Sequence, residues 1–159
     1  GLDTFSLSGG VIADDFDNDG YLDLMVSSMD PSEQLKFYRN QRDGTFSDQT
    51  VKAGLKGILG GLNLVQADFD NDGNLDLFLL RGAWFGVIGD HPNSLLRNNG
   101  NGTFTDITFA AGLANNNYPT QTAAWADFDN DGDMDIATTE ENGAWGVIWF
   151  ENPANTRSD

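Results

Sequence analysis

Three short segments of the chain carry closely spaced carboxylates, and these are the residues whose types and spacing could do chemistry. Each segment has the form Asp-x-Asp-x-Asp-Gly-x-x-Asp, and the three begin at Asp15, Asp68 and Asp127. The carboxylates of a segment, at least four in each, repel one another unless a cation lies among them. Calcium accepts roughly six to eight oxygen ligands in a flexible geometry, and aspartates at alternate positions of a tight loop can converge on it. The segments therefore predict about three calcium sites, one in each.

The predicted ligands occupy the same five positions of each segment. Positions 1, 3, 5 and 9 supply carboxylates, and position 7 supplies a backbone carbonyl. Position 6 is Gly, which allows the backbone to turn with a positive φ. The predicted ligands are Asp15, Asp17, Asp19, Tyr21 and Asp23 in the first segment, Asp68, Asp70, Asp72, Asn74 and Asp76 in the second, and Asp127, Asp129, Asp131, Asp133 and Asp135 in the third.

Other metals, and the EF-hand, fit these segments less well. Mg²⁺ demands a small octahedron and keeps its waters, and softer metals prefer His or Cys. An EF-hand requires Glu at position 12 of its loop, where this chain has Val26, Leu79 and Thr138. A solvated acidic turn would explain one copy, but three matching copies favour metal binding.

The composition limits the classes of partner. The chain of 159 residues has a net charge of −17, and three bound Ca²⁺ ions would leave about −11. Such an acidic surface disfavours nucleic acid and anionic membrane surfaces as partners. The absence of Cys excludes disulfides, zinc fingers and thiol catalysis. No apolar run is long enough to span a membrane, while 39% hydrophobic residues suffice for a core.

The acidic segments belong to a longer repeat. Their starting points lie 53 and 59 residues apart, and about five inserted residues account for the longer second unit. We predict repeats at 1–55 and 56–113, with a truncated one at 114–159. Each acidic segment is followed by a related stretch, namely Phe37-Tyr-Arg-Asn40, Leu95-Leu-Arg-Asn98 and Trp149-Phe-Glu-Asn152.

Apolar residues alternate on both sides of each acidic segment, which is typical of half-buried strands. The segments should therefore be the loops of β-hairpins. The stretches near 37–38, 95–96 and 148–150 suit a third strand, and Thr45-Phe46 and Thr103-Phe104 suit a fourth. A single helical turn is expected at 49–55. Four short strands per unit predict an all-β fold of propeller-blade-like repeats.

The loops, together with Arg97-Asn-Asn-Gly-Asn-Gly-Thr-Phe-Thr-Asp106 and the Ala-Gly-Leu at 53–55 and 111–113, resemble the FG-GAP/VCBS repeat family. Integrin α-subunit propellers carry related calcium loops. The resemblance implies propeller blades arranged in a ring. Three repeats are too few for such a ring, so we expect a piece of something larger, or several copies that complete a ring or stack.

The remaining candidate residues have simpler explanations. His91, the only histidine, is expected on a surface loop. Trp84 and Trp145, in two Gly-Ala-Trp segments, are expected to pack between units, although exposed aromatics can also stack on sugars. Asn101-Gly-Thr103 is a glycosylation sequon that coincides with a repeated turn, so its use is left open. The aspartates could supply a glycosidase pair but are better explained as calcium ligands, so no catalytic residue is predicted.

These observations predict a calcium-binding, non-enzymatic module of the extracellular space or cell surface. The family resemblance implies adhesion or recognition of a protein or glycan. One alternative is a structural subunit of an extracellular filament or layer, joined through open sheet edges. A second alternative is an accessory domain of a carbohydrate-active enzyme, with the catalytic residues elsewhere. Affinities typical of extracellular calcium modules, about 10⁻⁴ to 10⁻³ M, would not hold the ions at cytosolic calcium levels.

Overall fold

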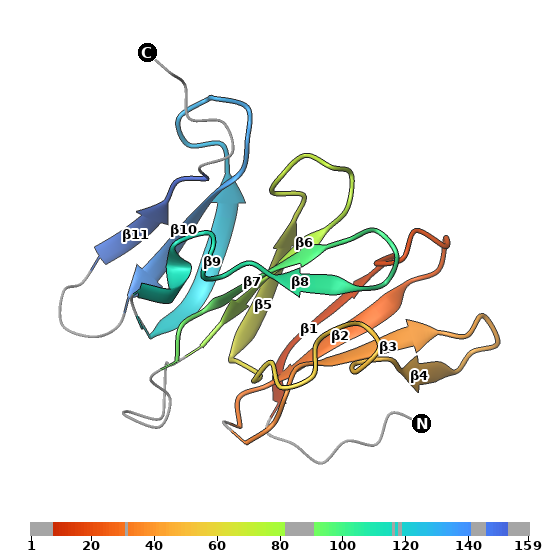
Figure 1. Cartoon of the computed structure of the whole chain (residues 1–159). Coiled ribbons are helices and arrows are strands. Elements are labelled where there is room, and N and C mark those ends of the chain that lie inside the picture. The colour runs from red at the N-terminus through yellow and green to blue at the C-terminus, as the bar shows by residue number, and fades with distance from the viewer. Residues whose placement is uncertain are drawn as a thin grey trace.

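The computed structural model describes residues 8–30, 32–81, 91–115, 117, 119–140 and 146–152, and in this part of the chain the fold is all-β (Figure 1). A short 3₁₀ turn, η2 (Leu113–Asn115), follows the second sheet. No helix of the described residues is long and apolar enough to cross a membrane. The strands are β1 (Ser8–Asp14), β2 (Asp23–Ser28), β3 (Lys36–Asn40) and β4 (Phe46–Asp48), then β5 (Asn63–Ala67), β6 (Asp76–Leu80), β7 (Ser94–Asn98) and β8 (Phe104–Asp106), then β9 (Thr120–Ala126), β10 (Asp135–Glu140) and β11 (Gly146–Phe150).

The strands form three antiparallel sheets that follow one another along the chain. The first sheet has the order β1-β2-β3-β4, the second β5-β6-β7-β8 and the third β11-β10-β9. Each sheet starts with a hairpin around one acidic loop, as the alternating pattern predicted. The fourth strands predicted at Thr45-Phe46 and Thr103-Phe104 are β4 and β8. The prediction of blade-like all-β repeats is therefore confirmed, whereas the unit boundaries at 1–55, 56–113 and 114–159 remain a prediction.

The three sheets stand face to face in a row, with the first strands β1, β5 and β9 next to one another (Figure 1). The second sheet is covered on both faces, which explains why all five residues of β6 are buried. Leu77 and Leu79 of β6 belong to the core shared with the first sheet. Phe78 and Leu80 point the other way, into the core shared with the third sheet. The alternation along one strand therefore supplies two cores.

An aromatic cluster fills the core between the first and second sheets. The rings of Phe16, Phe37 and Phe104 lie 5.8 to 6.1 Å apart between centroids, in edge-to-face contact. Phe16 comes from the first acidic loop and Phe37 from β3, whereas Phe104 comes from β8 of the second sheet. Such aromatic pairs add about 0.5 to 1.5 kcal/mol beyond their buried area. The cluster therefore joins two neighbouring sheets.

The phenylalanine at position 2 recurs in all three acidic loops, and its surroundings differ between them. Phe16 and Phe69 are 0% and 9% exposed, because the next sheet in the row covers them. Phe128 is 47% exposed, and its ring contacts Trp149 of β11. For Phe128 the described residues provide no further sheet.

Close backbone contacts allow the first and second sheets to approach each other. A Cβ on Gly60 would lie 2.2 Å from the Ser28 carbonyl oxygen, and one on Gly61 would lie 2.2 Å from that of Leu80. Only glycine fits at such distances. The linker between the first and second sheets, which contains Leu59 and Gly60, is also held by Arg81. The buried guanidinium of Arg81 donates hydrogen bonds to the carbonyls of Leu59, Gly60 and Pro92 and to the Ser94 hydroxyl. Burial lowers the pKa of Arg81 to about 10.

The turns between strands agree with the sequence. The helical turn expected at 49–55 is present, since the Ala53 amide donates to the Gln49 carbonyl at 2.8 Å. The Asn101 side chain accepts from the Thr103 amide at 3.1 Å, as Asp43 does from Thr45 at 2.9 Å, so the sequon has a turn role. His91 lies in the segment before β7, outside any strand, and is half-buried. The predicted packing of Trp84 and Trp145 falls outside the described residues.

Candidate metal centres

The three acidic loops share one backbone conformation. Gly20, Gly73 and Gly132 at position 6 have φ of 87°, 89° and 101°, as predicted. The asparagines at position 4 are also left-handed, and this was not predicted. Asn tolerates that region better than other side chains because its short amide bonds locally. The φ values of these asparagines are 56° for Asn18, 57° for Asn71 and 61° for Asn130.

The first aspartate of each loop organises the backbone. Both oxygens of Asp15 accept amide hydrogen bonds, from Asp19 at 2.9 Å and from Gly20 at 2.8 Å. Asp68 and Asp127 make the same pair of bonds in their own loops, at 2.9 Å and at 3.0 and 3.1 Å. These bonds curl the loop around its first carboxylate. As a result, the next carboxylates turn toward it.

The ninth aspartate ties each loop to the sheet and is fully buried in all three copies. In the second loop, Asp76 accepts from the Phe69 amide at 3.1 Å and from the Asn98 amide at 2.7 Å. Asp135 bonds the amides of Phe128 and Asn152 in the same way, at 3.0 and 2.9 Å. Position 9 therefore stabilises the hairpin whether or not it also binds a metal.

The carboxylates converge to within the reach of one ion. Three groups have oxygen atoms that all lie within 4.8 Å of one another: Asp15, Asp17 and Asp19; Asp68, Asp70 and Asp76; Asp127, Asp129 and Asp135. Several oxygens are buried without any hydrogen-bond donor among the described residues, and these include Oδ1 of Asp17, Oδ2 of Asp23, Oδ1 of Asp70 and Oδ2 of Asp131. A buried carboxylate oxygen without a donor is costly. The all-oxygen donor set, with its buried unpaired oxygens, fits a hard cation such as calcium.

The electrostatics of the loops point the same way. Burial raises the pKa of Asp76 to about 7, against the lowering effect of its two amide donors. Burial, reinforced by the neighbouring carboxylate of Asp72, raises the pKa of Asp70. Burial also raises the pKa of Asp23. Each shift marks a carboxylate whose negative charge is unfavourable in the protein alone. A bound cation would remove that cost.

The first loop differs from the others because arginines pair with it. Arg39 of β3 donates to Asp17 and, at 2.8 Å, to Asp19. Arg42, in the turn before β4, also donates to Asp19 at 2.8 Å, and this bond lowers the pKa of Asp19. The residue at the place of Arg39 is Arg97 in the second sheet and Glu151 in the third. The three loops therefore have unequal surroundings, and in the first loop two arginines share the carboxylates of Asp17 and Asp19.

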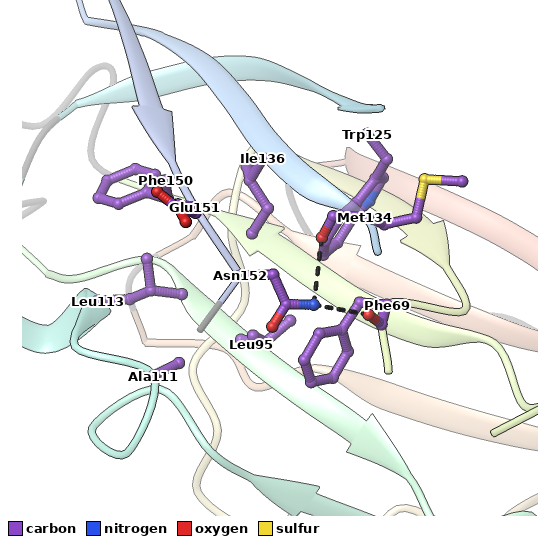
Figure 2. A pocket seen from close by; sticks show the side chains of 10 residues that line it. All are labelled: Phe69, Leu95, Ala111, Leu113, Trp125, Met134, Ile136, Phe150, Glu151 and Asn152. Atoms are coloured by element: carbon purple, nitrogen blue, oxygen red, sulfur yellow. Dashed lines mark hydrogen bonds between the residues drawn. The ribbon is translucent and has the colours of Figure 1, made fainter. Parts of the chain in front are cut away.

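Asparagine side chains connect the first and second loops to the sheet that follows each of them. The Asn98 amide group, at the end of β7, donates to the Phe16 carbonyl of the first loop at 3.1 Å. The Asn152 amide group, after β11, donates to the Phe69 carbonyl of the second loop at 2.7 Å (Figure 2). Both asparagines are buried. The loops also meet directly, since the Asn18 amide group donates to the Asn74 side-chain oxygen at 2.8 Å. The three loops lie on the same side of the row, one on each sheet (Figure 1).

The predicted site residues thus fall into three classes. Nine carboxylates form the three groups named above. The carboxylates of Asp23, Asp72, Asp131 and Asp133 belong to the same loops but not to those groups. For Tyr21, Asn74 and Asp133, the backbone carbonyls at position 7 remain predicted ligands. Sequence reasoning missed Arg39 and Arg42 as counter-ions and the asparagines that link the sheets. The recurrence of Asn40, Asn98 and Asn152 after each third strand was the available signal.

A family model described as an FG-GAP-like repeat matches residues 15–79 and 84–138. The chain belongs to the FG-GAP-like repeat family. The first match contains the acidic loops at 15–23 and 68–76, and the second contains the loop at 127–135, so the FG-GAP-like repeats coincide with the three candidate metal centres. The match to the family model confirms the resemblance inferred from the motifs. No curated protein matches the chain.

Proposed function

We propose that this FG-GAP-like chain is a calcium-binding, non-enzymatic recognition module of the extracellular space or cell surface. The observation that carries the proposal is the threefold recurrence of a carboxylate cluster on one loop backbone, with buried oxygens that no protein donor satisfies. Three hard-oxygen sites at one end of the sheets have the donor chemistry of calcium. The described part of the loops offers no His, which transition metals would prefer.

The ions act on stability. With a Kd of about 10⁻⁴ to 10⁻³ M and roughly millimolar calcium, each site contributes about 0.4 to 1.4 kcal/mol. Three sites then contribute roughly 1 to 4 kcal/mol, a large share of a typical folding free energy. Because the ninth aspartate and the loop phenylalanine connect each loop to the sheets, ordering of the loops also orders the contacts between sheets. Such affinities suit the millimolar calcium outside the cell.

Thermal unfolding in EDTA, calcium and magnesium tests the proposal. Calcium should raise Tm by roughly 3 to 15 °C over EDTA, and magnesium by less. The triple variant D17N/D70N/D129N keeps the shape of one carboxylate in each loop and should lose most of the calcium response. The control D30N/D43N/D48N removes three acidic charges outside the loops and should keep it. Equal melting in EDTA and calcium, together with no heat of calcium binding, would refute the proposal.

A second candidate function is assembly, with the chain as a structural subunit of an extracellular filament or layer. This candidate is supported by exposed apolar residues on the outer sheet faces, in addition to the open sheet edges. On the third sheet, Phe128, Val147 and Trp149 are exposed on the face turned away from the second sheet. On the first sheet, Val11 of β1 is exposed, and because its neighbour Ile12 lies in the core shared with the second sheet, Val11 faces the opposite, outer side. The corresponding faces inside the row are covered by a neighbouring sheet.

Head-to-tail pairing of these outer faces can be tested by sedimentation. W149D blocks the outer face of the third sheet, and V11D blocks that of the first. If pairing is head-to-tail, each variant alone is monomeric, while their mixture forms dimers through the two intact faces. The control V51D changes an exposed residue that lies outside the strands and so outside both outer faces. This variant should associate like the unmodified chain. A monomer at every concentration would exclude this candidate and leave the calcium proposal unaffected.

A further inference from the structure

Asn98, at the end of β7, holds groups of two neighbouring acidic loops at once. Its main-chain amide donates to Oδ1 of Asp76 in the second loop at 2.7 Å, and its side chain donates to the Phe16 carbonyl in the first loop at 3.1 Å. The Phe16 carbonyl and the Asp17 amide belong to one planar peptide group. Asn98 therefore fixes the peptide group that precedes Asp17. Both Asp76 and Asp17 belong to the carboxylate groups that converge within reach of one ion.

Asn152, just after β11, makes the same pair of bonds between the second and third loops. Its amide donates to Oδ1 of Asp135 in the third loop at 2.9 Å, and its side chain donates to the Phe69 carbonyl in the second loop at 2.7 Å (Figure 2). That carbonyl belongs to the peptide group that precedes Asp70, and Asp135 and Asp70 are again members of the converging groups. The link thus runs twice from the ninth position of one loop to the third position of the loop before it.

These links are shielded from water. Asn98 and Asn152 are 1% and 6% exposed, and Asp76 and Asp135 are fully buried. Because a buried polar group that loses its partner is costly, a shift of the ninth aspartate has to be followed by the asparagine. The two links also meet at one carboxylate, since Asp76 accepts from the Phe69 amide through Oδ2 at 3.1 Å and from Asn98 through Oδ1.

The loops touch a second time beside the links. The Asn18 side chain of the first loop donates to that of Asn74 in the second loop at 2.8 Å. The Asn71 side chain of the second loop donates to the Gly132 carbonyl in the third loop at 3.1 Å. Both donors stand at position 4, so this contact also recurs along the row. A change of shape in one loop therefore reaches the next loop at two points.

We propose that the three candidate calcium sites are coupled in order along the row, and that Asn98 and Asn152 are the positioning residues that couple them. An ion in one loop fixes the ninth aspartate of that loop. The asparagine bonded to this aspartate then holds the peptide group before the third position of the preceding loop. The preceding loop consequently loses less conformational freedom when it binds its own ion, and the coupling is reciprocal. The inference rests on the proposed calcium binding and adds cooperativity to it.

A site-resolved calcium titration of the whole chain tests the coupling, with the amide NMR signals of Gly20 and Gly73 reporting on the first and second loops separately. The double variant D70N/D72N disables the second loop, keeps the shape of both side chains and leaves the ninth aspartate in place. The calcium midpoint at Gly20 should rise by about fivefold or more in D70N/D72N. In about 1 M KCl the Debye length is about 3 Å, so the loss of charge in the second loop is screened from the first.

The same comparison in an N98A background tests the link itself. N98A removes the side-chain donor to the Phe16 carbonyl, so D70N/D72N should then change the midpoint at Gly20 far less. A general loss of stability in N98A acts with and without D70N/D72N and cancels in the comparison. The control N99A changes the adjacent exposed asparagine, whose side chain bonds the hydroxyls of Thr103 and Thr105 in its own hairpin. N99A should keep the full dependence on D70N/D72N.

The inference is overturned if the midpoint at Gly20 does not depend on D70N/D72N, or if N98A and N99A show the same dependence. The first comparison needs no change at Asn98, so it stays decisive if N98A fails to fold. Independent calcium binding at the loops refutes the coupling and leaves the proposed function standing. Absence of calcium-induced shifts at Gly20, Gly73 and Gly132 refutes the proposed function and the coupling with it.

Discussion

The asparagine that joins neighbouring sheets offers the sharpest test of the structure. Asn98 is buried, and its side chain makes two hydrogen bonds: it donates to the Phe16 carbonyl at 3.1 Å and accepts from the Gly100 amide at 3.0 Å. The variant N98A leaves the carbonyl of a fully buried residue without its donor. A buried unsatisfied polar group costs about 1 to 3 kcal/mol, and the second, partly buried bond adds about 1 kcal/mol. We therefore expect N98A to lower the free energy of unfolding by about 2 to 4 kcal/mol.

The chain contains its own control for this variant. Asn40 occupies the same repeat position in the first sheet, where its side chain donates to the exposed Leu22 carbonyl at 2.9 Å and accepts from the Arg42 amide at 2.9 Å. Water can replace both partners, so N40A should cost about 1 kcal/mol or less. Urea unfolding in EDTA measures both variants without contributions from bound ions. Equal costs for N98A and N40A would refute the idea that these asparagines hold the sheets together.

Three further predictions concern charge, protonation and backbone space. R39Q/R42Q should tighten calcium binding at the first loop at low salt, since the two guanidinium groups then no longer pair with Asp17 and Asp19; R97Q serves as the control, and titration calorimetry would show an unchanged first site if the arginines do not compete. In EDTA, folded Asp76 has a pKa of about 7, above its unfolded value of about 3.9, so the unmodified chain should lose stability relative to D76N as the pH rises from about 4 to about 7; parallel pH profiles would contradict this. G61A should destabilise the fold more than G57A, because its Cβ would lie 2.2 Å from the Leu80 carbonyl oxygen, whereas G57A adds only the strain of a left-handed residue (φ 83°) in open space; equal urea midpoints would argue against the close contact.

Much of the fold could be predicted from local sequence because the repeat displays each signal more than once. Alternating apolar residues predicted the hairpins, and the Gly-Thr-Phe turns predicted β4 and β8. The relation between sheets could not be predicted in this way. Burial of Phe69 and exposure of Phe128 depend on whether another sheet follows, and both residues stand in the same local sequence. Likewise, nothing near Arg81 shows that its guanidinium meets carbonyls from a linker about twenty residues earlier.

The candidate metal centres could likewise be predicted from local sequence only in part. The spacing of aspartates located all three loops and the left-handed glycines. It could not show that the ninth aspartate accepts an amide bond from the end of the third strand, nor that, among the described residues, arginines pair with the first loop alone, because these contacts join residues 17 to 23 positions apart. Local patterns predict which carboxylate oxygens each loop contains. Hydrogen bonds from residues of the third strand, or directly after it, determine how many of these oxygens remain free for a cation.

The position of the asparagine links has a mechanical consequence. The two links end on the carbonyls of Phe16 and Phe69, and the amide of Phe69 is in turn held by the ninth aspartate of its loop, Asp76. A tensile load passed from one sheet to the next would therefore run through the hairpins that carry the candidate metal centres. Stretching single molecules in calcium and in EDTA would reveal this as a difference in rupture force. The surrounding calcium concentration would then set the stiffness of the row of sheets, because bound ions would stiffen the hairpins through which neighbouring sheets are linked.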